Sequence, residues 1–194
     1  MSVRVIAGLA KGRRLAVPDV VGLRPTSDRA RETLFNVLAP RLPGARFLDL
    51  FAGSGAIGIE ALSRGAMAAV FVEHDARALT TLAANLELCR LAGRGTVVRG
   101  DWQRALRRIA GAEAPFDIAF LDPPYDWADA HTCLAAILDH ALIGAKGVAI
   151  VEHRAEQAPQ PATGWELFRR VDVGGTSFSF FVVVEGVETA ASTG

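Results

Sequence analysis

The chain has 194 residues, no net formal charge and 51% hydrophobic residues, which is ordinary for one globular domain with a small extension. No apolar run approaches the ~20 residues that cross a bilayer, and the N-terminus lacks the apolar core of a secretory signal. The two cysteines and four histidines do not have metal-ligand spacing. We therefore expect a cytoplasmic protein with no metal site and no membrane attachment.

The balanced charge conceals a basic N-terminus. Residues 1–46 contain nine Lys or Arg residues and three acidic residues, so the rest of the chain is acidic overall. A basic arm on a mildly acidic body favours the binding of a polyanion at one end. The alternative is solvated surface charge without a partner.

The predicted elements alternate along most of the chain. Residues 3–7 and 13–17 predict a basic β-hairpin, and Asp28–Leu38 predicts a helix capped by Thr26 or Ser27. The strands expected next are 47–51, 69–72, 96–99, 117–121 and 147–152. A glycine-rich turn at 52–58 leads into a helix to about residue 64, a helix to about residue 109 follows residues 100–102, and two further helices are expected at 75–91 and 129–142. Two last strands, 165–173 and 177–185, flank a turn at Gly174-Gly175.

This alternation predicts an α/β fold with a doubly wound, mostly parallel sheet and an antiparallel hairpin at one edge. We expect the basic extension to occupy residues 1–44 and the main domain residues 45–186. Residues 187–194 are small and polar and are expected to fray.

One stretch, Asp122-Pro123-Pro124-Tyr125, combines the groups of an acceptor site at the end of an apolar strand. The prolines present carbonyl acceptors without N–H donors, and Tyr125 offers a flat face for stacking. Acceptors beside such a face suit a planar group bearing NH2, such as a nucleobase amine. Two accepted hydrogen bonds would leave the lone pair of that nitrogen aimed at an electrophile. The alternative is a plain exit from a strand into a loop.

Acidic residues recur where the predicted parallel strands end, at Asp49, Glu73, Asp101 and Asp122. The turn after the first strand fits Gly-x-Gly-x-x-Gly, with Glu73 20 residues after Gly53, which is also the pattern of a dinucleotide-binding enzyme. Asp49 would repel a pyrophosphate but suits the ammonium and sulfonium groups of S-adenosylmethionine. Asp101 and Trp102 can accept from an adenine amine and stack on its ring. Glu73 and Asp101 could instead only cap the helices that follow.

Together these motifs resemble a known family. Residues 49–55 (Asp-Leu-Phe-Ala-Gly-Ser-Gly), Glu73 and residues 122–125 are similar to class I S-adenosylmethionine-dependent methyltransferases that methylate amino groups. Residues 24–32 (Arg-Pro-Thr-Ser-Asp-Arg-Ala-Arg-Glu) and 60–66 (Glu-Ala-Leu-Ser-Arg-Gly-Ala) resemble the RsmD family, bacterial enzymes that methylate N2 of one guanine in 16S ribosomal RNA. The resemblance covers nearly the whole chain. It departs at Gly174-Gly175, where the family often has Tyr-Gly.

The resemblance implies a Rossmann-like seven-stranded sheet with an N-terminal β-hairpin extension, S-adenosyl-L-methionine as cofactor, and 16S rRNA within the 30S subunit or an assembly intermediate as partner. We expect a monomer. The implied catalytic residues are Asp122, Pro123, Pro124 and Tyr125. The implied cofactor-binding residues are Asp49, Phe51, Ala52, Gly53, Ser54, Gly55, Glu73, His74, Asp101, Trp102 and Asp122. The implied RNA-binding residues are Arg4, Lys11, Arg13, Arg14, Arg24, Thr26 and Arg29.

Several alternatives stay open at this point. The same four residues would serve a methyltransferase acting on adenine N6 or on a glutamine amide. A NAD-dependent oxidoreductase using the glycine-rich turn and a non-catalytic RNA-binding module belong to other classes. The sequence does not indicate which guanine is modified, or whether the substrate is naked RNA or an assembled subunit.

Overall fold

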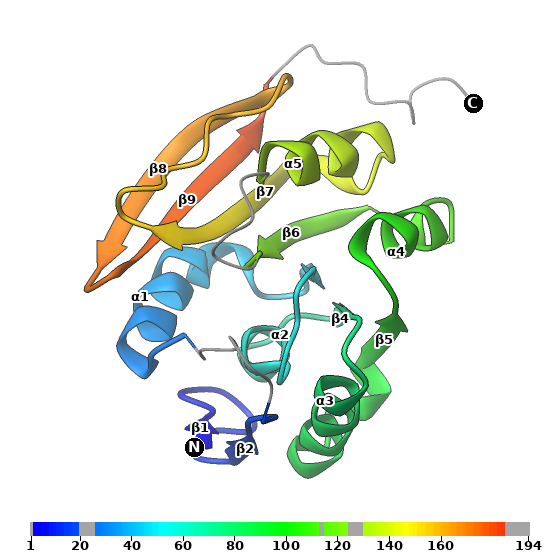
Figure 1. Cartoon of the computed structure of the whole chain (residues 1–194). Helices are drawn as coiled ribbons and strands as arrows, with labels where there is room; N and C mark the ends of the chain where they lie inside the picture. The colour runs from blue at the N-terminus through cyan, green and yellow to red at the C-terminus, as the bar shows by residue number, and fades with distance from the viewer. Residues whose placement is uncertain (1, 20–25, 113–114, 124–129, 185–194) are drawn as a thin grey trace.

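A seven-stranded sheet with helices on both faces forms the body of the protein in a computed structural model that describes residues 2–19, 26–112, 115–123 and 130–184 (Figure 1). Its strands are β3 (Arg46–Asp49), β4 (Ala68–Glu73), β5 (Gly95–Arg99), β6 (Phe116–Leu121), β7 (Ile143–Arg154), β8 (Trp165–Val173) and β9 (Thr176–Val183). The order across the sheet is β5-β4-β3-β6-β7-β9-β8. Strands β3 to β7 pair in parallel and β9 is antiparallel to both of its neighbours. The predicted doubly wound sheet with an antiparallel edge is therefore confirmed.

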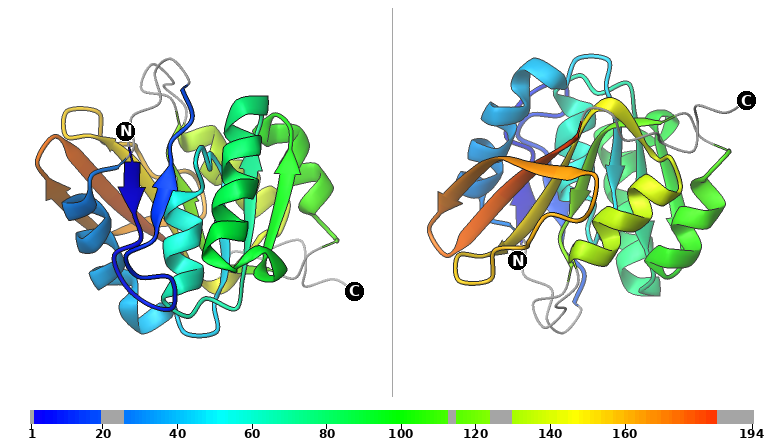
Figure 2. Two further views of the ribbon diagram at one scale, coloured as in Figure 1. Left: turned by 90° about the horizontal axis from the view of Figure 1, so that it is seen from below. Right: turned by 90° about the horizontal axis from the view of Figure 1, so that it is seen from above.

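Two layers of helices cover the sheet, as Figure 2 shows from two further directions. One face carries α1 (Asp28–Leu38), α2 (Ala56–Ser63), α3 (Ala76–Cys89) and the hairpin of β1 (Ser2–Arg4) and β2 (Arg14–Ala16). The other face carries α4 (Trp102–Ile109) and α5 (Ala130–Asp139). Two short 3-10 helices, η1 (Ala39–Arg41) and η2 (Ala92–Arg94), complete the described elements.

Alternate residues of each central strand contribute to different cores. In β6, Ile118 and Phe120 pack on the α1–α3 side, whereas Ala119 and Leu121 pack on the α4–α5 side. Burial on both faces explains why this strand has a continuous apolar run. None of the helices in the described ranges has the length and apolar character required to span a membrane.

Two elements differ from the expected boundaries near the middle of the chain. Helix α5 ends at Asp139 rather than 142, and β7 begins at Ile143 rather than 147. The strand is irregular there, because its register with β6 shifts between Phe116 and Ile118. A Cβ on Gly147 would lie 2.5 Å from the Ile143 side chain, so a glycine at this position allows the irregular pairing.

A buried carboxylate holds the N-terminal hairpin against the main sheet. Glu60 on α2 is fully buried and accepts the amide hydrogens of Ile6 at 2.7 Å and Ala7 at 3.0 Å. The same carboxylate pairs with Arg64 at 2.6 Å and with the buried Arg31 of α1 at 3.7 Å. Hairpin, α1 and α2 are thus joined at one charged group.

Ser63, one turn further along α2, provides a second attachment. Its hydroxyl accepts from the Ala10 amide at 2.9 Å and donates to the Ala7 carbonyl. The Leu9 amide donates to the Ser63 carbonyl at 2.8 Å. The segment from Glu60 to Arg64 therefore contributes to docking the hairpin.

Candidate active site

Four carboxylates lie at the carboxyl ends of four neighbouring strands. Phe71, Phe120 and Ile150 belong to the core on the α1–α3 side and are aligned across β4, β6 and β7 by the strand register. Each is followed two positions later by an acid, and Asp49 aligns with Phe71 and Phe120. Because side chains alternate along a strand, all four acids lie on that same side of the sheet. These four residues form the acid cluster: Asp49, Glu73, Asp122 and Glu152.

Glu152 was not among the residues predicted from the sequence. It is 4% exposed, and the Thr26 hydroxyl donates to its Oε2 at 2.8 Å. The signal was nevertheless present, because the predicted strand 147–152 ends on this acid just as the preceding strands end on theirs.

The glycine-rich loop between β3 and α2 is held by two of these acids. Glu73 accepts the amide hydrogens of Gly53 at 2.8 Å and His74 at 2.7 Å. Asp49 accepts the amide hydrogen of Gly58 at 2.9 Å, in the first turn of α2. The loop and the start of α2 are therefore shaped by the carboxylates that the sequence assigned to ligand binding.

Gly55 must be a glycine at the start of α2. Its φ is +78°, and a Cβ there would lie 2.2 Å from the Leu82 side chain of α3. The Ser54 carbonyl accepts from the Asn85 side-chain amide at 2.9 Å, and Asn85 also accepts the Ala16 amide hydrogen at 2.9 Å. This asparagine links the loop to the hairpin.

Of the two acids expected to cap helices as an alternative role, Asp101 does so and Glu73 does not. Asp101 is exposed and caps α4 by accepting the Gln103 amide hydrogen at 3.0 Å, which is the capping role left open by the sequence. Glu73 does not cap α3, because Asp75 does so through the Arg77 and Ala78 amides. Trp102 is half-buried in the first turn of α4.

Burial and mutual repulsion raise the pKa of Asp49, Asp122 and Glu152. Burial raises the pKa of Asp49 to about 7, and the charges of Glu73 and Glu152 act in the same direction. Burial also raises the pKa of Glu152 to about 7, although its bond from Thr26 opposes this. The pKa of Asp122 lies well above its ordinary value because of desolvation and the nearby Glu152 and Asp49. Such a cluster favours a ligand that carries positive charge.

The ligand-free protein is expected to lose stability as the pH rises from about 4 to about 7. Asp49 has an unfolded pKa of 3.8 and a folded pKa of about 7, so the folded state binds more protons across that window. The free energy of unfolding then falls with rising pH, by up to about 1.4 kcal/mol per pH unit for each such group. Melting temperatures from about pH 5 to about pH 8 should fall less steeply in Asp49→Asn. Equal slopes of melting temperature against pH in the wild-type protein and in Asp49→Asn would contradict Asp49 as the source of this pH dependence.

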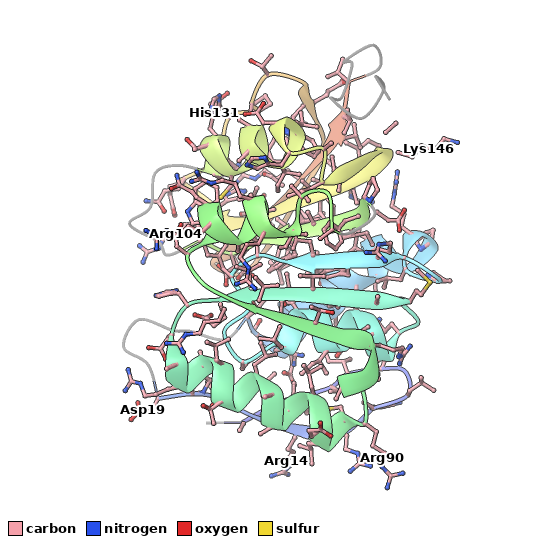
Figure 3. All side chains as sticks on the ribbon, turned by 90° about the vertical axis from the view of Figure 1, so that its right-hand side faces the viewer. Arg14, Asp19, Arg90, Arg104, His131 and Lys146 are labelled. Carbon is pink, nitrogen blue, oxygen red and sulfur yellow. The ribbon has the colours of Figure 1, made fainter. Side chains whose placement is uncertain are left out.

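The predicted RNA-binding residues are spread along the hairpin and the start of α1. Arg4 and Arg14 are exposed and directly opposite each other in the β1–β2 ladder, and Arg14 points outward in Figure 3. Arg29 is exposed in the first turn of α1. Lys11 and Arg13 lie further from the acid cluster, because the hairpin tip packs at the C-terminal end of α2.

Other predicted residues are placed as follows. Thr26 is half-buried and its hydroxyl is bonded to Glu152 within the protein. Pro123 is buried directly after Asp122, and His74 is exposed after Glu73. Arg24, Pro124 and Tyr125 lie outside the described residues.

A family model described as conserved hypothetical protein 95 matches residues 3–182, which is nearly the whole chain. The chain belongs to this, the RsmD family. The Escherichia coli K12 protein named ribosomal RNA small subunit methyltransferase D is 38% identical over 180 residues, covering 92% of this chain and 89% of that protein. The protein of the same name from Haemophilus influenzae is 33% identical over 179 residues, covering 92% of this chain and 93% of its own length.

Two solved structures agree with the fold. A candidate methyltransferase of Escherichia coli, yhhF, superposes with a TM-score of 0.80 at 37% identity, covering 94% of this chain and 98% of that chain. A hypothetical protein of Thermus thermophilus superposes with a TM-score of 0.80 at 34% identity, covering 94% of this chain and 99% of that chain. The methyltransferase sheet predicted from the resemblance is confirmed.

Proposed function

We propose that this RsmD-family protein transfers a methyl group from S-adenosyl-L-methionine to N2 of one guanine in 16S ribosomal RNA. The observation that supports it most is the juxtaposition of Asp122 and Pro123, at the end of β6, with the glycine-rich loop at the end of the neighbouring β3. Relatives named ribosomal RNA small subunit methyltransferase D match this chain over most of their length. The proposed substrate is a small subunit or an assembly intermediate.

The acid cluster fits a cationic methyl donor. Asp49 and Glu152 are nearly fully buried, and neither forms an ion pair with another described residue. The donor supplies an electrophilic methyl group on a positively charged sulfur. Residues proposed to hold it are Asp49, Phe51, Ala52, Gly53, Ser54, Gly55, Glu73, His74, Asp101, Trp102 and Asp122.

Asp122 and Pro123 are proposed to orient the acceptor. The Asp122 carboxylate and the Pro123 carbonyl would accept the two hydrogens of guanine N2 and direct its lone pair. Tyr125 is proposed to stack on an extruded base, which is worth ~1–3 kcal/mol in other proteins. With Pro124 fixing the chain direction, these groups would act by positioning rather than as a strong base.

The hairpin is proposed to contact RNA phosphates. Arg4 and Arg14 are directly opposite in an antiparallel ladder, where like charges repel each other. Asp28 pairs with Arg4 at 3.3 Å, and the exposed Arg14 beside it is proposed to bind a phosphate at this surface. Lys11, Arg13, Arg24 and Arg29 would extend this surface. Residues 1–44 would thus form the RNA-contacting extension of a methyltransferase domain at 45–186, acting as a monomer in the cytoplasm.

Removing the facing arginines should weaken RNA binding without affecting the donor. The double substitution Arg4→Gln and Arg14→Gln is expected to raise the KM for the subunit ~10-fold. Affinity should also depend less on salt, with the negative slope of log affinity against log salt smaller in magnitude by about two. Donor affinity should stay unchanged. The matched control replaces the exposed Arg107 and Lys146, which lie on other elements, by glutamine. Equal effects of both pairs would contradict a specific role for the hairpin.

Methyl transfer from labelled S-adenosylmethionine to unmodified small subunits tests the proposed function. Label in the 16S RNA is the expected result. Label in a protein would indicate a glutamine-amide acceptor. Binding of NADH without methyl transfer would favour the oxidoreductase alternative, and RNA binding without donor binding would favour a non-catalytic module.

A further inference from the structure

Glu152 accepts a hydrogen bond from Thr26 that its place in the acid cluster does not explain. It is one position beyond Val151, which pairs with Leu121, so it lies beside the residue that follows β6, Asp122. Its Oε2 accepts from the Thr26 hydroxyl at 2.8 Å across a sequence separation of 126 residues. This bond joins the acceptor side of the site to the start of α1.

Thr26 lies just before α1, which is hydrogen-bonded to the hairpin. Ser27, the next residue, caps α1 by accepting the Ala30 amide hydrogen. The buried Arg31 of α1 donates at 2.7 Å to the Arg4 carbonyl in β1 and at 2.7 Å to Asp28. The residues proposed to contact RNA are therefore connected through α1 to Thr26.

We propose that Thr26 and Glu152 form a positioning pair, whose hydrogen bond holds the α1–hairpin unit in register with the acceptor site at Asp122. This inference rests on the proposed function. A hydroxyl that donates to a carboxyl oxygen makes a directional hydrogen bond, here 2.8 Å long, which suits a fixed distance between two parts of one site. Neither residue needs to touch the reacting atoms: the pair determines where a base carried by bound RNA lies relative to Asp122.

Valine has the shape of threonine without its hydroxyl, so Thr26→Val tests this role directly. We expect kcat on unmodified small subunits to fall ~10- to 100-fold, as misplacement of a substrate by about 1 Å can do. The KM for the subunit, donor affinity without RNA and the melting temperature should change little. Thr26→Ser restores the hydroxyl and should return kcat to within about threefold of wild type.

Thr33→Val is the matched control. Thr33 lies on α1, and its hydroxyl donates to the Arg29 carbonyl of the same helix at 3.0 Å. Loss of the Thr33 hydroxyl should leave kcat unchanged. The inference is overturned if Thr26→Val turns over like wild type, if Thr26→Ser is as slow as Thr26→Val, or if lost turnover is matched by lost donor binding and a lower melting temperature.

The same experiment separates this inference from the function on which it rests. Wild-type methyl transfer with an unaffected Thr26→Val variant overturns the positioning pair alone. Absence of transfer by the wild-type protein, with donor bound, overturns the proposed function and the pair together.

Discussion

Replacing Asp122 by alanine is expected to slow methyl transfer ~10- to 100-fold while the protein stays folded. The substitution removes the carboxylate proposed to hold a hydrogen of the target amine, and a hydrogen bond to a charged group contributes ~1.5–3 kcal/mol. Asp122 is a desolvated acid whose pKa is raised by Glu152 and Asp49, so its removal relieves repulsion. The melting temperature should therefore not fall, and donor affinity should be largely kept.

Single-turnover rates, donor titrations and thermal melts on one preparation distinguish these effects. Asp139→Ala is the matched control, because Asp139 is an exposed acid at the end of α5. It should behave as wild type in all three measurements. Full activity of Asp122→Ala would contradict the proposed orientation of the acceptor, and complete loss of donor binding would show that Asp122 acts mainly by holding the donor.

The largest effect on stability is expected from Glu60→Ala. The substitution leaves the amides of Ile6 and Ala7 without their acceptor and leaves the buried Arg31 without one of its partners. Breaking a buried ion pair by removing one partner costs about 3–5 kcal/mol. For a chain of this size that corresponds to a fall in melting temperature of roughly 10 °C.

Thermal melts and hydrogen exchange together locate this loss. The Ile6 and Ala7 amides should exchange much faster in Glu60→Ala, because the hairpin loses its attachment to α2. Glu87→Ala removes an exposed acid from α3 and should change neither measurement. A small change in melting temperature with protected hairpin amides would show that the hairpin is held mainly by its apolar contacts.

Most of the sheet could be predicted from the sequence, because the pattern of its strands is local. Helix α1 begins and ends at the predicted residues, with Ser27 as its cap. The Gly174-Gly175 turn joins β8 and β9 as expected. The start of β7 could not be predicted, because glycines that usually indicate a loop here permit an irregular strand against Phe116.

The acidic residues at the strand ends could be predicted from the sequence, but the hydrogen bonds and ion pairs between distant segments could not. Acidic residues at the ends of β3, β4 and β6 could be assigned to one edge of the sheet, since parallel strands end together. Charge counting could not show that Arg31 is buried beside Glu60 rather than available for RNA. It also could not show that Thr26 bonds to Glu152, because the two residues are 126 positions apart in the sequence.

Nucleoside analysis of 16S RNA after reaction of unmodified 30S subunits with labelled S-adenosylmethionine tests the central claim most directly. We predict label in N2-methylguanosine at a single site with the wild-type protein, and much less label after the same reaction time with Asp122→Ala. Label in N6-methyladenosine would contradict guanine N2 as the acceptor. Absence of label from the RNA, with donor bound to the protein, would contradict the proposed function.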